Sequence, residues 1–156
     1  MRQGEVPDDL RELVFSFFHK FSRFEFALKD AGKWRKGPYG AALPDWDGFV
    51  ADHVATYQLT ASATALVAAN PKKQVVGDND HGLEFTALTF DEDVSDLARV
   101  SRLARTVRNN LFHGGKHDAE GWDNPARIRE LLPLASTVLD EFAELAAISG
   151  DYEGAY

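Results

Sequence analysis

The residue types that could act on a phosphate gather between positions 108 and 117. Arg108 is followed at once by Asn109 and, a little further on, by His113. An arginine grips phosphate through its planar guanidinium group, and a histidine titrates near neutral pH and can transfer a proton. The spacing alone also fits a structural role, because a histidine in the last turn of a helix favours the helix dipole. The stretch therefore allows two interpretations, phosphate chemistry or simple stabilisation of a helix end.

Charge is distributed unevenly along this acidic chain. The 156 residues carry 25 Asp and Glu against 17 Lys and Arg, and the net charge of −8 excludes a protein that binds nucleic acid through its overall charge. Residues 78–96 hold seven acidic residues and no lysine or arginine. Residues 97–117 hold no acidic residue and five basic ones: Arg99, Arg102, Arg105, Arg108 and Lys116. This pattern indicates a local phosphate-binding surface, and the alternative is a solvated face whose arginines pair with acids elsewhere.

Several kinds of site are excluded or not expected. The chain has no cysteine, which excludes disulfides, thiolate metal sites and cysteine nucleophiles. The polar loop around His81 lacks the calcium-loop pattern and has no partner at zinc spacing, so we expect no metal and no cofactor. No apolar run approaches the roughly 20 residues that span a bilayer, and no signal-peptide pattern is found at the N-terminus. We therefore expect a cytoplasmic protein that does not bind a membrane.

The first half of the chain is expected to be helical around one irregular loop. Apolar residues at helical spacing follow Asp8 and Asp9, either of which could cap the helix. Glycine and proline predict a loop over 33–40. Asp45 is the expected N-cap of the next helical stretch, 46–69, and whether this stretch forms one long helix or two short ones stays open.

The second half is expected to hold a small insertion and two long helices. Short apolar runs around a polar turn predict a β-hairpin or structured loop around 74–90. The helix that carries the basic residues begins near the acidic run 91–93 and ends at the glycines 114–115. The last helix is expected to begin with Asn124 as N-cap and Pro125 in its first turn.

Together these elements predict an all-α fold, a four- to five-helix bundle with a small β-hairpin or loop insertion around 74–90. We expect one domain over residues 1–156, with a core of about 8–147. The tail, 149–156, is expected to be frayed.

The motif and its setting resemble the HEPN superfamily of small all-helical proteins. In that family an arginine, a polar residue directly after it and a histidine four to six residues further on lie near the end of the third main helix. Arg108, Asn109 and His113 fill these three positions. Residues 21–29 look like part of the first helix of small bacterial HEPN proteins, and the order of helices is similar over most of the chain, roughly 8–147.

The resemblance implies a metal-independent endoribonuclease, often a toxin or an anti-phage effector. RNA carries its own nucleophile, the 2′-hydroxyl group, and cleavage would leave a 2′,3′-cyclic phosphate and a 5′-hydroxyl. On this hypothesis His113 is the general base or acid, Arg108 stabilises charge on the phosphate, and Asn109 orients the phosphate or His113. The expected substrate-binding residues are Arg105, Lys116 and His117, and for the last two a solvated surface position is the alternative.

A homodimer is expected from both the geometry and the resemblance. Arg108 and His113 lie about 140° apart on a regular helix, so one chain presents the pair poorly unless the helix loosens. In HEPN relatives, motif residues of two protomers line one cleft. The homodimer would therefore complete the site across a symmetric interface.

The phenylalanines of the first helix also indicate two contact surfaces. The expected main stripe holds Phe17, Phe18, Phe21 and Phe24. Phe15 and Phe26 are expected to project away from it, and the alternative is a single wide buried face. Glu25 falls within the stripe, where an unpaired carboxylate is costly. We expect it to form a salt bridge with Arg108 or else Arg105, and the alternative is a position at the edge of the stripe, in water.

A second function fits the same resemblance. The alternative to the ribonuclease is a non-catalytic HEPN module that binds a nucleotide or a protein partner. An antitoxin or regulatory protein is a further candidate partner. Many relatives that an antitoxin modifies carry a tyrosine two residues after the histidine, and Gly115 stands there in this chain. That departure counts against the same mode of neutralisation here.

Overall fold

The computed structural model describes residues 6–78, 82–113 and 124–154, with the backbone alone of His113. These residues form six α-helices: α1 (Asp8–Asp30), α2 (Trp46–His53), α3 (Ala61–Ala69), α4 (Asp96–His113), α5 (Pro125–Leu145) and α6 (Ser149–Glu153). The described part of the chain is thus mainly helical, with two small antiparallel hairpins, which confirms a helical bundle with a β insertion. The number of helices is six rather than the expected four or five.

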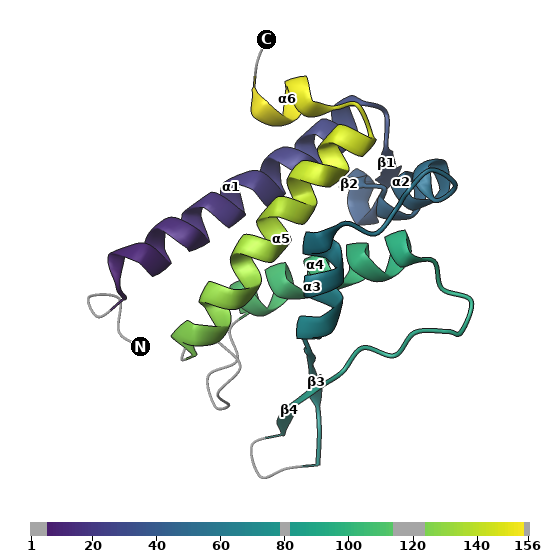
Figure 1. The fold of residues 1–156 in the computed structure, drawn as a ribbon. Helices are drawn as coiled ribbons and strands as arrows, with labels where there is room; N and C mark the ends of the chain where they lie inside the picture. Colours follow the sequence, from purple (N-terminus) through teal and green to yellow (C-terminus); the bar gives the residue numbers. More distant parts are fainter. Residues whose placement is uncertain (1–5, 79–81, 114–123, 155–156) are drawn as a thin grey trace.

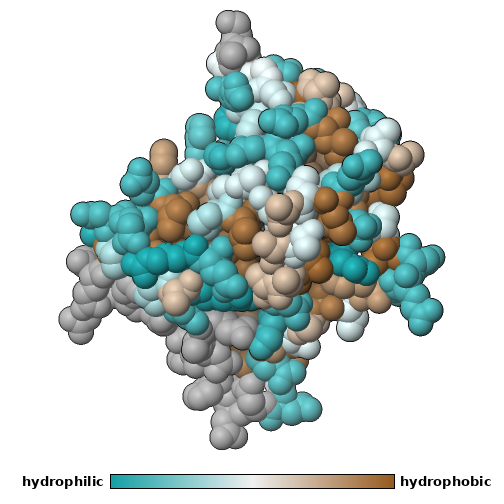
Figure 2. Space-filling view, in the orientation of Figure 1, coloured by the Kyte–Doolittle hydropathy of each residue, from teal (hydrophilic) through white to brown (hydrophobic). Residues whose placement is uncertain are grey.

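The bundle is built on the pairing of the first long helix with the last one. α1 and α5 lie side by side, and α6 folds back over the end of α1 (Figure 1). α4 packs against α2, α3 and α5. On the face that Figure 2 shows, hydrophobic and hydrophilic residues are interspersed and do not form one large apolar patch.

An aromatic cluster forms the centre of the core. Phe24 is fully buried, and its ring lies 5.1 Å from Trp46 and 5.6 Å from Phe49. Phe142 of α5 lies 6.1 Å from Phe24, and Tyr152 of α6 lies 6.4 Å from it. Large rings from α1, α2, α5 and α6 therefore meet at one point, which fixes how these four helices pack.

Two of the three helix N-caps that the sequence predicts are present. The side chain of Asp45 accepts a hydrogen bond from the backbone N–H of Gly48 at 3.1 Å, and that of Asn124 accepts one from Arg127 at 3.1 Å. The expected cap at Asp8 or Asp9 is wrong, because Pro7 occupies the N-cap position and makes no side-chain cap. The two aspartates lie in the first turn of α1, where their charge still favours the helix dipole.

Residues 46–69 form two short helices and not one long helix. α2 ends at His53, and α3 begins afresh at Ala61. Thr60 caps α3 by accepting a hydrogen bond from the N–H of Ala63 at 3.0 Å. A capping threonine directly before the alanine-rich run therefore marks the boundary between the two helices.

Two segments have more structure than the sequence predicts. The expected loop at 33–40 belongs to a hairpin of β1 (Trp34–Lys36) and β2 (Ala42–Pro44), which a 3₁₀ turn at Pro38–Gly40 connects. Tyr39 and Gly40 of this turn have positive φ. Each strand is too short to show a period in the sequence, so the pattern does not reveal the hairpin.

The expected frayed tail is wrong for residues 149–153, which form α6. The Tyr152 side chain is buried, and its hydroxyl donates to Asp140 at 2.6 Å. Burial, together with this hydrogen bond, raises the pKa of Tyr152 above its ordinary value. Arg23 of α1 donates to the backbone carbonyl of Tyr152 at 3.2 Å. One buried ring and these side-chain bonds therefore fix a helix whose own sequence shows little helical pattern.

The expected hairpin before the basic helix is present. β3 (Lys73–Val76) pairs with β4 (Leu83–Thr86) in antiparallel register, with Lys73 opposite Thr86. The pair projects from the bundle below α3 and α4 (Figure 1). Just before β3, the Asn110 side chain donates to the backbone carbonyl of Lys72 at 2.7 Å. This bond ties the base of the hairpin to α4, as a marginally stable two-stranded ribbon requires.

Candidate functional site

The helix that holds most of the basic residues is anchored through one apolar face. Ser95 precedes α4 and accepts a hydrogen bond from the N–H of Ala98 at 3.2 Å. The buried apolar residues of α4 are Leu97, Val100, Leu103, Ala104 and Val107. Because these residues hold one face in the core, the four arginines on the other side of α4 are at least partly exposed.

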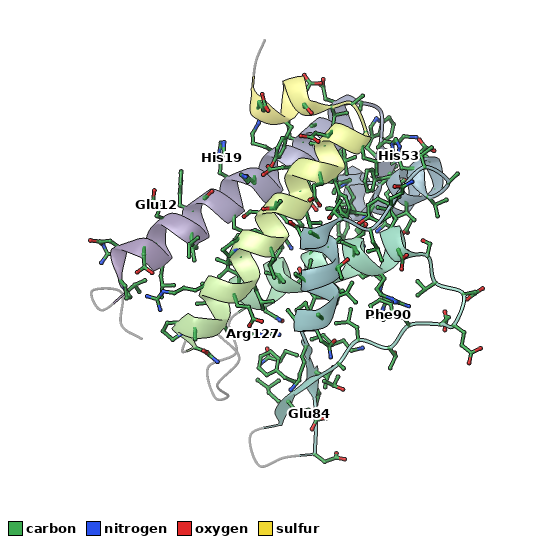
Figure 3. The ribbon with its side chains drawn as sticks, in the orientation of Figure 1. Glu12, His19, His53, Glu84, Phe90 and Arg127 are labelled. Atoms are coloured by element: carbon green, nitrogen blue, oxygen red, sulfur yellow. The ribbon has the colours of Figure 1, made fainter. Side chains whose placement is uncertain are left out.

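The four arginines of α4 each lie over an aromatic ring. Arg99 and Arg102 lie 5.5 Å and 4.9 Å from the ring centre of Phe90, beside α4 in Figure 3. Arg105 lies 5.6 Å from the ring of Trp46. Arg108 lies between two rings, 5.5 Å from Phe21 and 5.2 Å from Phe112. These cation–π contacts orient the guanidinium groups and leave their charge in place.

The same arginines have no acidic partner within the described residues. The ion pairs found there join other side chains, and none of them includes Arg99, Arg102, Arg105 or Arg108. Among the described residues, therefore, no acidic side chain neutralises these four arginines, which was the alternative interpretation of the charge pattern. α4 presents a row of cations that an added anion could reach.

The expected salt bridge of Glu25 is wrong. Its carboxylate accepts a hydrogen bond from the indole N–H of Trp46 at 2.9 Å, and among the described residues no ion pair joins it to Arg105 or Arg108. Trp46 is the ring beneath Arg105. Glu25 therefore supports the arginine row indirectly, by fixing the orientation of that ring.

Arg108 and Asn109 form a pair close to the end of α4. The guanidinium Nη1 of Arg108 donates to Oδ1 of Asn109 at 3.1 Å. α4 stays helical as far as position 113, so the helix does not loosen before it. Positions 108 and 113 remain about 140° apart, whereas positions 109 and 113 lie about one turn apart on the same side.

A polar hollow of about 330 Å³ lies beside Asn109, between α4 and β3. The described residues that line it are Lys73, Gln74, Thr106, Asn109 and Asn110. No carboxylate is among these residues, and one of them is a lysine, so the hollow suits an anionic or hydrogen-bonding group. Lys73, Gln74 and Asn110 were not expected from the sequence. Thr106, Asn109 and Asn110 lie on one face of α4, and their spacing in the sequence is the signal that could have identified the polar hollow.

Other expected site residues lie outside the described part of the chain. Lys116 and His117 fall in the gap between residues 113 and 124, and of His113 only the backbone is described. Their side-chain positions therefore stay predictions.

The outer face of α1 differs in part from expectation. Phe15 and Phe26 project outward as expected, with 69% and 40% of their surfaces exposed. Phe18 was expected on the buried stripe but is 45% exposed. Its ring lies 5.5 Å from that of Phe112, which is itself 50% exposed. Phe18 and Phe112 thus form a small aromatic patch next to Arg108.

Two further features of the described residues bear on function. No helix among them is both long enough and apolar enough to cross a membrane. They also contain no group of three or more His, Cys, Asp or Glu side chains placed to hold a metal ion. No family model matches the chain, and no curated protein or solved structure matches it either.

Proposed function

We propose that this chain is a HEPN-type domain that cleaves RNA without a metal ion, as a homodimer. The observation that carries the proposal is the arginine row of α4. Its cations lie on aromatic rings without acidic partners among the described residues, and the row ends in the Arg108–Asn109 pair just before His113. A helix arranged in this way offers phosphate binding along its length and a proton-transfer group at its end.

The proposed reaction needs the chain's side chains, the RNA and water. The 2′-oxygen of a ribose attacks the adjacent phosphorus, and the bond from phosphorus to the 5′-oxygen breaks. The 2′-hydroxyl loses a proton and the departing 5′-oxygen gains one; His113 carries out one of these transfers, as general base or general acid, and water carries out the other. Arg108 stabilises the negative charge on the non-bridging oxygens. Asn109, bonded to Arg108, holds the guanidinium in place, and the products are a 2′,3′-cyclic phosphate and a 5′-hydroxyl.

The homodimer completes this site. Because positions 108 and 113 face directions about 140° apart, one chain would use its arginine together with the histidine of a second copy. The exposed rings of Phe18 and Phe112 lie beside Arg108 and supply an apolar surface for that contact. Light scattering at micromolar concentration tests the dimer, and a monomer at that concentration would contradict it.

The biological setting proposed with this activity is the cytoplasm, where the protein would act as a toxin or an anti-phage effector. A partner that restrains it, an antitoxin or a regulatory protein, is part of the same proposal. An acidic protein with one basic helix would cut RNA at selected positions and would not coat it.

The decisive experiment follows labelled RNA with the wild-type chain and with His113→Ala. We expect cleavage by the wild type in the presence of EDTA, with a cyclic phosphate on the 5′ fragment, and a loss of about 10²- to 10⁴-fold in His113→Ala. Arg11→Ala serves as control, since Arg11 is an exposed arginine that pairs with Asp8 on α1. Absence of cleavage by the wild type, or equal cleavage by all three chains, would overturn the proposal and favour the non-catalytic binding module.

A further inference from the structure

A second hollow lies where α2 packs against the first half of α4. Its volume is about 140 Å³, several times the roughly 30 Å³ that one water molecule occupies in the liquid. The polar and aromatic side chains that line it are Trp46, Asp47, Ser101, Arg102 and Arg105. It is separate from the polar hollow beside Asn109, with which it shares no lining residue.

Ser101 presents a hydroxyl that the fold leaves unsatisfied. The residue is only 2% exposed, and its Oγ has no hydrogen-bond partner among the described residues. A serine or threonine inside a helix commonly donates to the carbonyl four residues earlier. Thr106 on the same helix does so, since its Oγ1 donates to the carbonyl of Arg102 at 2.8 Å. A buried polar group without a partner is costly, and a rotation of the Ser101 side chain about its Cα–Cβ bond, towards a ligand in the hollow, would remove that cost.

The two arginines at the hollow are oriented in advance. Arg102 lies on the ring of Phe90 and Arg105 on the ring of Trp46, and neither has an ion-pair partner among the described residues. Trp46 is in turn fixed by its hydrogen bond to Glu25. Two guanidinium groups that are already oriented lose little freedom when they bind an anion, and their planar forks suit phosphate oxygens.

We propose that this hollow is a phosphate-binding site in which Arg102, Arg105 and the Ser101 hydroxyl hold one phosphate group. The group could belong to an RNA strand or to a free nucleotide, because both present the same oxygens. Arg105 precedes His113 by about 12 Å along the helix axis, so the site lies apart from the proposed cleavage site. It concerns binding alone and stands whether or not the chain cleaves RNA.

Asp47 sharpens the proposal because its charge has the opposite effect. Its exposed carboxylate lines the same hollow and would repel a phosphate. Replacing it with the neutral Asp47→Asn should therefore tighten phosphate binding. A basic surface elsewhere on the protein that binds anions non-specifically would not respond to this change.

The experiment measures binding by calorimetry to inorganic phosphate, to AMP with adenosine as its uncharged counterpart, and to a short single-stranded RNA. We expect Arg102→Gln and Arg105→Gln each to weaken phosphate binding about 10-fold, and Ser101→Ala to weaken it several-fold. Asp47→Asn should strengthen binding several-fold. Arg105→Lys keeps the charge and should restore part of the affinity. Arg11→Gln is the matched control, and circular dichroism with thermal melting checks that each variant is folded.

The outcomes separate the two sources of phosphate. Binding of AMP and inorganic phosphate that depends on Arg102 and Arg105 supports a free-nucleotide site. An effect of the same variants on RNA, with competition by inorganic phosphate, supports an RNA subsite. No binding of any phosphate probe, equal binding of adenosine and AMP, or equal losses in Arg11→Gln and Arg102→Gln would overturn the proposal. Loss of cleavage in His113→Ala, with phosphate binding unchanged, would show that the two sites are independent.

Discussion

The two longest helices of the second half, α4 and α5, use arginine in opposite ways. On α5, Arg127 pairs with Glu130 at 2.6 Å, and Arg129 pairs with Asp9 of α1 at 2.7 Å. On α4, the arginines lie on aromatic rings and have no acidic partner in the described residues. Arg127 also donates to the backbone carbonyl of Ala69 in α3, so both arginines of α5 link that helix to another element, whereas those of α4 remain available to an anion.

The difference has a simple physical basis. A carboxylate beside a guanidinium cancels its field and occupies its donors. An aromatic ring holds the same group through its quadrupole and adds no charge. An acidic protein that keeps one helix free of carboxylates therefore concentrates its attraction for phosphate in one place. The predictions below test this comparison between α4 and α5.

The largest expected effect is on RNA cleavage. Arg108→Ala should lower the cleavage rate by about 10²- to 10³-fold, because it removes the cation that stabilises the transition state. Arg129→Ala on α5 should leave the rate per folded molecule unchanged. The measurement is the single-turnover rate on labelled RNA, and similar losses in the two variants would break the comparison.

A smaller effect is expected on the salt dependence of RNA binding. Replacing Arg102, Arg105 and Arg108 with glutamine should lower the slope of log affinity against log salt by about 2, as expected for three lost contacts at roughly 0.7 each. The double variant of Arg127 and Arg129, which loses two charges on α5, should keep the wild-type slope. Affinities measured at several salt concentrations, with an inactive His113→Ala background in both sets, decide between these outcomes.

The aromatic rings should contribute a few-fold to RNA affinity. Phe90→Ala removes the ring beneath Arg99 and Arg102, and cation–π contacts are worth about 0.5–1 kcal/mol each at exposed sites. We expect binding to weaken by about two- to five-fold in a fluorescence-anisotropy titration. Phe85→Ala on β4 is the control, since Phe85 is also half-buried and lies over no arginine among the described contacts. An equal effect of both variants would show that the ring acts only through stability.

The smallest effect is the pH dependence of the ion pair that joins Arg129 of α5 to Asp9 of α1. The hydrogen bond from Arg129 holds the pKa of Asp9 below its ordinary value of 3.8. Since the folded-state pKa is lowered, the stabilisation is present above the ordinary pKa and is lost as pH falls through the folded-state value. The melting temperature of wild type should therefore exceed that of Asp9→Asn slightly at pH 5, and the difference should vanish near pH 2. The difference between wild type and Arg102→Gln should stay constant over this range, because Arg102 has no carboxylate partner in the described residues.

Sequence pattern predicted the long helices well, and it did so for physical reasons. α1, α4 and α5 each repeat apolar residues over many turns, and Asn124-Pro125 marks the start of α5 chemically. α6 and the β1–β2 hairpin are too short to show a period. α6 is fixed by contacts with other helices, such as the bond from Tyr152 to Asp140 of α5 and the bond from Arg23 of α1 to the backbone carbonyl of Tyr152.

The site was predictable in its residue types and not in its contacts. The charge pattern identified the basic residues of α4. Whether an acidic side chain lies beside them depends on how the other elements pack, which the pattern does not show. Glu25 illustrates this, because its partner is the indole of Trp46 and not an arginine of α4. Phe18 likewise sits at the edge of the apolar stripe, where a rotation of the helix by a few tens of degrees decides between core and surface.

The pairing of α1 with α5 has a consequence for how the protein is made. During synthesis α1 emerges first, while its main partners, α5 and α6, emerge last. Until α5 forms, the phenylalanine-rich face of α1 is therefore covered only in part, by contacts such as those of Phe21 and Phe24 with Trp46 of α2. Contacts between such distant segments also form slowly. The helix at the centre of the aromatic core is thus the segment most exposed to aggregation before folding, and nascent chains that end before α5 should depend most on chaperones.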